Sequence, residues 1–117
     1  MIRVTITLSK EGVIERLSAS GHAGGVKGSD VVCSAFTILL RTFVRCLESS
    51  SKLDWSVETD QPNEFEVKVA EVKLPQEAEY RGWCGFLLRG VDDLQNDSPQ
   101  GVALRVIQSQ RGVFHGT

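Results

Sequence analysis

The sequence predicts an α+β domain with the element order β-β-α-β-β-α-β, in which a largely antiparallel or mixed sheet packs against two main helices. Three observations indicate this fold class. Apolar and polar residues alternate in several short segments, apolar residues recur at helical spacing in two longer segments, and turn residues link neighbouring strands. With 117 residues the chain is near the commonest domain size, so we expect one domain over residues 1–117.

The first half of the chain predicts a hairpin followed by a helix. Residues 2–8 alternate apolar and polar side chains, residues 10–12 form a turn, and residues 13–20 return as the second strand. Residues 30–49 then change period and predict an amphipathic helix, which ends at the serines of 49–51. Its apolar face comprises Val32, Phe36, Leu39, Leu40, Phe43 and Leu47.

The second half repeats this order. Residues 54–59 and 64–70 predict two strands, Pro75 opens a second helix, residues 96–100 form a loop, and residues 102–107 predict the last strand. The buried stripe of this helix comprises Tyr80, Trp83, Cys84, Leu87, Val91 and Leu94.

Two features make the C-terminal part less regular. Glycines are unfavourable inside a helix, and three of them interrupt the second helical pattern, at Gly82, Gly85 and Gly90. The tail after about residue 110 is expected to be loose apart from Val113 and Phe114.

Composition narrows the class of function. The chain is 41% apolar and 24% charged with a net charge of −2, and phosphate binding usually shows as a basic excess. We therefore expect no direct nucleic-acid partner. Neither a signal peptide nor a run of about 20 apolar residues is evident, so a cytoplasmic protein with no membrane partner is expected.

The three cysteines, Cys33, Cys46 and Cys84, form no C-x-x-C pair, which argues against a zinc knuckle or a dithiol redox motif. Cys46 lies about 220° around the helix from Cys33 at roughly 100° per residue. The two thiols therefore cannot share a site. Cys84 falls on an apolar stripe, and we expect both Cys46 and Cys84 in the core.

The segment GHAGGVKGSDVVCSA, residues 21–35, carries the chemistry. It holds His22 and Cys33 eleven residues apart, with glycines between them, where the predicted helix begins. A thiol reacts as its thiolate, which helix N-termini and neighbouring imidazolium groups favour. We interpret the two residues as a dyad: the thiolate attacks a peptide carbonyl, and the imidazolium protonates the leaving amine. Nearby backbone N–H groups would form the oxyanion site.

Each of these residues also has a structural interpretation. A cysteine in an amphipathic helix is most often a small buried hydrophobe, and a histidine at a strand end is usually structural. Asp30 either caps the helix or accepts a hydrogen bond from His22 and holds its ring. Metal binding by His22 and Cys33 would need more ligands, so no metal and no cofactor are expected.

The same segment resembles the signature of the ribosomal-processing cysteine proteases, the Prp family. The likeness lies in GHA, a short glycine-containing loop and DVVCSA, and the predicted layout fits that family over roughly residues 1–108. The matching positions are Gly21, His22, Ala23, Asp30, Val32, Cys33 and Ala35.

The resemblance implies removal of the N-terminal extension of large-subunit ribosomal protein twenty-seven, after an aromatic residue and before a basic stretch. It implies a homodimer in which His22 and Cys33 are the catalytic pair. Asp30 and Ser34 would be supporting or capping residues, and Ser34 replaces the more usual alanine. The substrate loop would comprise Gly21, Ala23, Gly24, Gly25, Val26, Lys27, Gly28 and Ser29.

A second hypothesis comes from another class of function. The chain could instead be a non-catalytic ribosome-assembly or peptide-binding module, in which a sheet edge binds an extended chain. Selective reactivity of Cys33 would distinguish the enzyme from this module.

Overall fold

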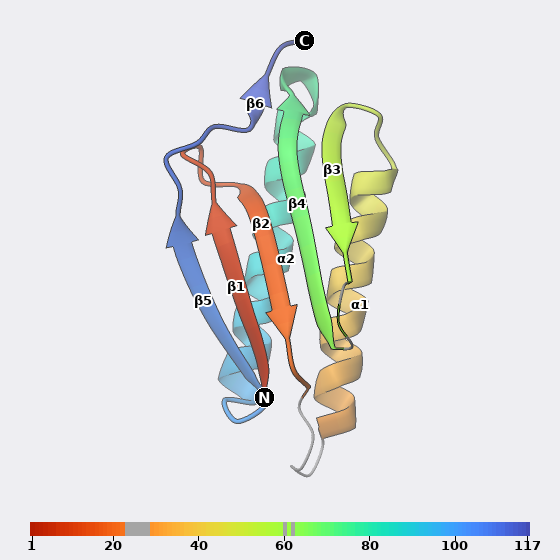
Figure 1. Cartoon of the computed structure of the whole chain (residues 1–117), viewed down its shortest axis with the longest axis vertical. Helices are drawn as coiled ribbons and strands as arrows, with labels where there is room; N and C mark the ends of the chain where they lie inside the picture. The colour runs from red at the N-terminus through yellow and green to blue at the C-terminus, as the bar shows by residue number, and fades with distance from the viewer. Residues whose placement is uncertain (23–28, 60, 62) are drawn as a thin grey trace.

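The computed structural model describes residues 1–22, 29–59, 61 and 63–117, with only the backbone described at residues 29 and 30. These residues form a six-stranded sheet and two α-helices, as Figure 1 shows. The elements are β1 (Ile2–Leu8), β2 (Ile14–Ser20), α1 (Ser29–Glu48), β3 (Leu53–Glu58), β4 (Glu64–Lys73), the 3₁₀ turn η1 (Leu74–Gln76), α2 (Glu77–Asp97), β5 (Val102–Gln108) and β6 (Phe114–His115).

The sheet is mixed, and its strand order is β3-β4-β2-β1-β5. The pairs β1–β2, β2–β4 and β3–β4 are antiparallel, whereas β5 runs parallel to β1. The short β6 continues alongside the end of β4, also parallel. The predicted α+β fold class and its element order are therefore confirmed, with β6 as an addition.

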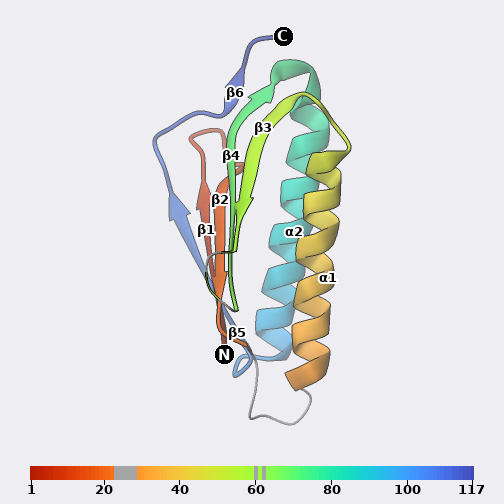
Figure 2. The same ribbon diagram turned by 45° about the vertical axis from the view of Figure 1, so that its right-hand side comes forward.

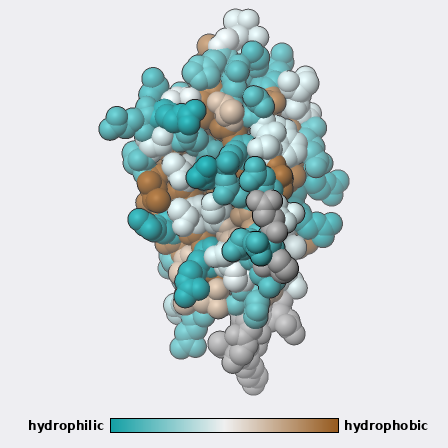
Figure 3. Space-filling view, in the orientation of Figure 1, coloured by the Kyte–Doolittle hydropathy of each residue, from teal (hydrophilic) through white to brown (hydrophobic). Residues whose placement is uncertain are grey.

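Both helices lie on one face of the sheet, as Figure 2 shows. The alternation in β1 places Ile2, Val4 and Ile6 in the core beneath them. The intervening Arg3 is exposed on the opposite face. That face is largely hydrophilic in the space-filling view of Figure 3. The buried stripe of α1 comprises Phe36, Leu40, Phe43 and Leu47. Among the described residues, no helix is both long enough and apolar enough to cross a membrane.

Helix α2 runs without interruption through all three of its glycines. Gly90 has a packing role, because a Cβ there would lie 2.9 Å from Cδ2 of Leu39 on α1. Gly82, by contrast, has open space around it. Tyr80 ties the helix to the sheet by donating its hydroxyl proton to the carbonyl of Ile14 at 2.6 Å. Pro75 lies in the η1 turn that leads into α2, two residues before the helix itself begins.

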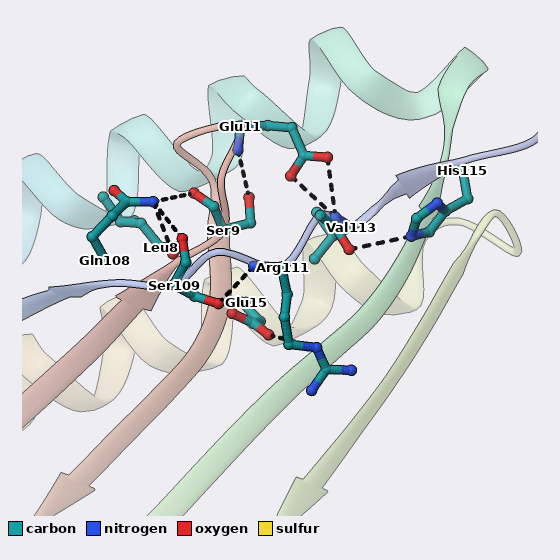
Figure 4. Close-up of polar contacts among 10 residues, drawn as sticks. Leu8, Ser9, Glu11, Glu15, Gln108, Ser109, Arg111, Val113 and His115 are labelled. Carbon is teal, nitrogen blue, oxygen red and sulfur yellow. Dashed lines mark hydrogen bonds and ion pairs between the residues drawn. The ribbon is translucent and has the colours of Figure 1, made fainter.

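The C-terminal segment is held to the β1–β2 turn, an arrangement that the sequence pattern does not indicate. The Glu11 carboxylate accepts hydrogen bonds from the backbone N–H groups of Val113, at 3.0 Å, and Phe114, at 3.3 Å. Arg111 pairs with Glu15 at 3.6 Å, and Figure 4 shows both carboxylates facing this segment. Val113 is buried, so the segment covers part of the core.

Candidate active site

A cavity of about 610 Å³ lies between α1 and the adjoining ends of β2 and β4. His22 and Cys33 both line it, although eleven residues separate them in the chain. Much of the remaining wall is apolar and comprises Ile2, Ala19, Phe36, Leu40, Val44 and Phe65. The cavity therefore combines a thiol, an imidazole and an apolar surface in one place.

The backbone fixes where His22 leaves the sheet. Gly21 has a φ of +85°, and its N–H donates to the carbonyl of Asn63 at 2.9 Å. A Cβ at Gly21 would collide with the carbonyl oxygen of Met1, so glycine is required at this position. The Met1 amino group donates to the carbonyl of His22 at 2.7 Å. These contacts place an exposed imidazole at the edge of the cavity.

Cys33 is the fifth residue of α1, since the helix begins at Ser29, one residue before the predicted start. Unpaired N–H groups and the helix macrodipole favour negative charge at the start of a helix, and this effect fades after the first turn. Cys33 lies just at that limit. Its side chain is partly buried and packs against the hydrophobic core on one side. The other side contributes to the cavity wall.

The other two cysteines have different surroundings. Cys84 is buried, and its sulfur accepts a hydrogen bond from the Ile14 N–H at 3.4 Å. Burial raises the pKa of the Cys84 thiol to about 11, so it stays protonated at neutral pH. Partial burial also raises the pKa of Cys46, which is not among the described residues around the cavity. The expectation that Cys84 is a core residue is confirmed, whereas the same expectation for Cys46 is wrong, because Cys46 is only partly buried and lies outside the described core cluster.

Several predicted site residues fall outside what the structure describes. Residues 23–28 of the predicted substrate loop lie outside the described residues, as do the side chains of Ser29 and Asp30. The two roles considered for Asp30 therefore stay predictions. Ser34 lies on another face of α1, where it lines a second groove, between α1 and α2. Within the described part of the chain, no group of three or more His, Cys, Asp or Glu residues could hold a metal ion.

Other cavity residues were not identified from the sequence. Thr37 and Arg41 follow Cys33 at intervals of four residues and share its face of α1, so helical periodicity could have indicated them. Asn63 and Phe65 reach the cavity because β2 pairs with β4. That pairing joins segments more than forty residues apart, as in Ala19 opposite Phe65. No local pattern reveals it.

A thiol and an imidazole bordering one apolar cavity is an arrangement used by cysteine-dependent hydrolases. The chain belongs to the cysteine protease Prp family, whose sequence model matches residues 1–103. It is accordingly a cysteine protease. No curated protein matches the chain in sequence.

Solved structures share the fold over almost the whole chain. SMU.848 from Streptococcus mutans is 24% identical, with a TM-score of 0.78 over 93% of this chain and 96% of that one. An essential ribosomal processing protease Prp from S. aureus, in complex with a substrate peptide, is 20% identical, with a TM-score of 0.76 over 91% of this chain and 99% of that one. The structure of the S. aureus protease with a covalently linked product peptide is 19% identical, with a TM-score of 0.73 over 91% of this chain and 99% of that one.

Proposed function

We propose that this protein is an endopeptidase that removes the N-terminal extension of large-subunit ribosomal protein twenty-seven, with Cys33 as nucleophile and His22 as acid. The observation that supports the dyad most directly is that both side chains line one cavity of about 610 Å³. Family membership supports peptide hydrolysis. The S. aureus relative, described as an essential ribosomal processing protease bound to a substrate peptide, supports the choice of substrate.

The chemistry follows from the two groups. The Cys33 thiolate attacks the carbonyl carbon of the scissile peptide bond, and backbone N–H groups near the start of α1 stabilise the oxyanion. Protonated His22 then gives its proton to the leaving nitrogen as the C–N bond breaks, which leaves a thioester on Cys33. His22 next removes a proton from water as the water attacks the thioester, and the C–S bond breaks to release the acid and to restore the Cys33 thiolate beside protonated His22.

The apolar wall suits the aromatic residue that precedes the cleaved bond in substrates of this family. Phe36 and Phe65 line the cavity and can pack against such a side chain, and burying it excludes water from the reacting bond. We also propose that the protein works in the cytoplasm and as a homodimer. Size-exclusion chromatography with light scattering tests the dimer, and a monomeric mass would contradict it.

The test is cleavage of a synthetic peptide that spans the junction of the extension and the mature ribosomal protein. Wild-type protein should release both fragments, and Cys33→Ala should reduce the rate by at least about a thousandfold because no nucleophile remains. Cys46→Ala is the matched control, since it removes a thiol from the same helix outside the cavity. It should cleave at nearly the wild-type rate.

Two outcomes would contradict the proposal. Cleavage by Cys33→Ala at the wild-type rate would exclude this nucleophile. Binding of the peptide without cleavage by wild-type protein would favour a peptide-binding module. Circular dichroism of each variant shows whether it is folded, so that a loss of cleavage caused by unfolding is recognised.

A further inference from the structure

The wall of the cavity formed by α1 carries two positive charges. Arg41 and Arg45 both line the cavity, and both are exposed. Among the described residues neither of them takes part in an ion pair, although five such pairs occur elsewhere. Two guanidinium groups thus border the candidate peptide site, and no described carboxylate lies within ion-pair distance of either.

Their distance from Cys33 follows from helix geometry. Arg41 is eight residues and Arg45 twelve residues beyond Cys33, which corresponds to about 12 and 18 Å along the axis at 1.5 Å per residue. An extended peptide advances about 3.3 Å per residue. A substrate lying along α1 with its scissile bond at Cys33 would therefore bring its fourth or fifth residue from that bond beside the arginines.

The two arginines repel each other until an anion binds. Like charges at positions i and i+4 of a helix are unfavourable, which offsets part of the stabilisation that Arg45 gains in the last turn of α1. A carboxylate between them removes this repulsion and can accept parallel N–H donors from a planar guanidinium. The apolar floor at Leu40 and Val44 lowers the local dielectric and strengthens such a contact.

Two carboxylates also border the cavity, and their positions set the charge pattern. Glu48 is one turn beyond Arg45, at the far end, and is not within ion-pair distance of either arginine. Glu64 lies at the start of β4, on the same side of the cavity as Gly21 and His22. Among the described charged side chains of the cavity wall, Glu64 therefore lies near His22, Arg41 and Arg45 follow along α1, and Glu48 lies beyond them.

We propose that Arg41 and Arg45 form an anion subsite that selects peptides with an acidic side chain four or five residues before the scissile bond, because the residues after that bond are basic in the proposed substrate. The inference rests on the proposed peptidase function and specifies its substrates further. The two arginines are specificity-determining residues, because they recognise the peptide at a distance from the bond that breaks.

The test measures binding of peptides to Cys33→Ala protein, so that its outcome does not depend on cleavage. Matched fluorescent peptides carry Asp, Asn or Lys at the fourth and fifth positions on either side of the junction. Before the junction the Asp peptide should bind about fivefold more tightly than the Asn peptide, the upper range for exposed ion pairs. The preference should weaken as salt is added.

Variants made in the Cys33→Ala background assign the effect to the subsite. Arg41→Gln combined with Arg45→Gln should remove the preference for Asp, and Arg41→Glu combined with Arg45→Glu should shift it toward Lys. Arg89→Gln is the control, because Arg89 is exposed on α2 and is not among the described residues of this cavity. It should leave the preference unchanged.

The outcomes separate the subsite from the proposed function. Equal affinities for Asp and Asn peptides, an identical preference in the double variant, or no binding of any peptide would overturn the subsite. Preferential binding without cleavage by wild-type protein would support the subsite and contradict the peptidase proposal. Cleavage by wild-type protein with no charge preference would support the peptidase proposal and contradict the subsite.

Discussion

At the scale of single residues, the surroundings of the three thiols decide which of them can react. Cys84 is enclosed in the core with a pKa raised to about 11, and burial raises the pKa of Cys46 as well. Cys33 alone among the three lines the cavity that His22 also borders. Sequence spacing predicted this division, because the positions of the cysteines on their helices already separate them.

Glu11 is a second residue whose environment has a measurable consequence. Partial burial opposes ionisation of its carboxyl, but hydrogen bonds from Ser9 and from the N–H groups of Val113 and Phe114 outweigh it and lower the pKa of Glu11. A lowered pKa in the folded state stabilises the protein above the pKa of the unfolded chain. This contribution disappears as the pH falls through the folded-state pKa.

Glu11→Gln should therefore lower the free energy of unfolding at neutral pH by about 1 kcal/mol, a typical value for a partly exposed carboxylate that accepts hydrogen bonds. The difference from wild type should shrink as the pH falls below the ordinary glutamate range. Urea denaturation at several pH values measures it. Glu58→Gln is the control, because Glu58 is an exposed residue of β3. A difference that is independent of pH would contradict the assigned role of Glu11.

At the scale of elements, the glycines of α2 are distinguishable by what surrounds them. Gly82→Ala should raise the free energy of unfolding by about 0.5–1 kcal/mol, because alanine favours the helix and the new methyl group meets open space. Gly90→Ala should show no such gain, since its methyl group would press on Leu39 of α1. Thermal and chemical denaturation measure both. Equal gains would show that the contact between the helices is not tight at Gly90.

The elements themselves were largely predictable, and β1, β2, α1 and β5 begin and end within one residue of the predicted positions. Alternation in β1 and the apolar stripe of α1 reflect burial on one side, which the sequence records locally. Strand β4 extends to Lys73, three residues beyond the predicted end, because its last residues pair with β3 on one side and with β6 on the other. The anchoring of the last strand depends on Glu11, about a hundred residues away. A local pattern contains no information about such a contact.

At the scale of the whole molecule, the site exists because the sheet brings distant segments together. His22 follows β2 and Cys33 lies on α1, and their closeness in sequence made the pair predictable. The opposite wall comes from β4, and its Phe65 meets the site through long-range strand pairing. Sequence spacing could therefore indicate the chemistry of the site but not the shape of the cavity or the charges along it.

The measurement that tests the central claim most directly is the rate of iodoacetamide labelling at each cysteine, followed by peptide mass mapping. At about pH 6, Cys33 should react at least about tenfold faster than Cys46 or Cys84, because it lines the cavity beside His22 whereas burial raises the pKa of the other two thiols. His22→Ala should remove this advantage while leaving the other two rates unchanged. Labelling of Cys33 no faster than Cys46, or at a rate unaffected by His22→Ala, would contradict the account.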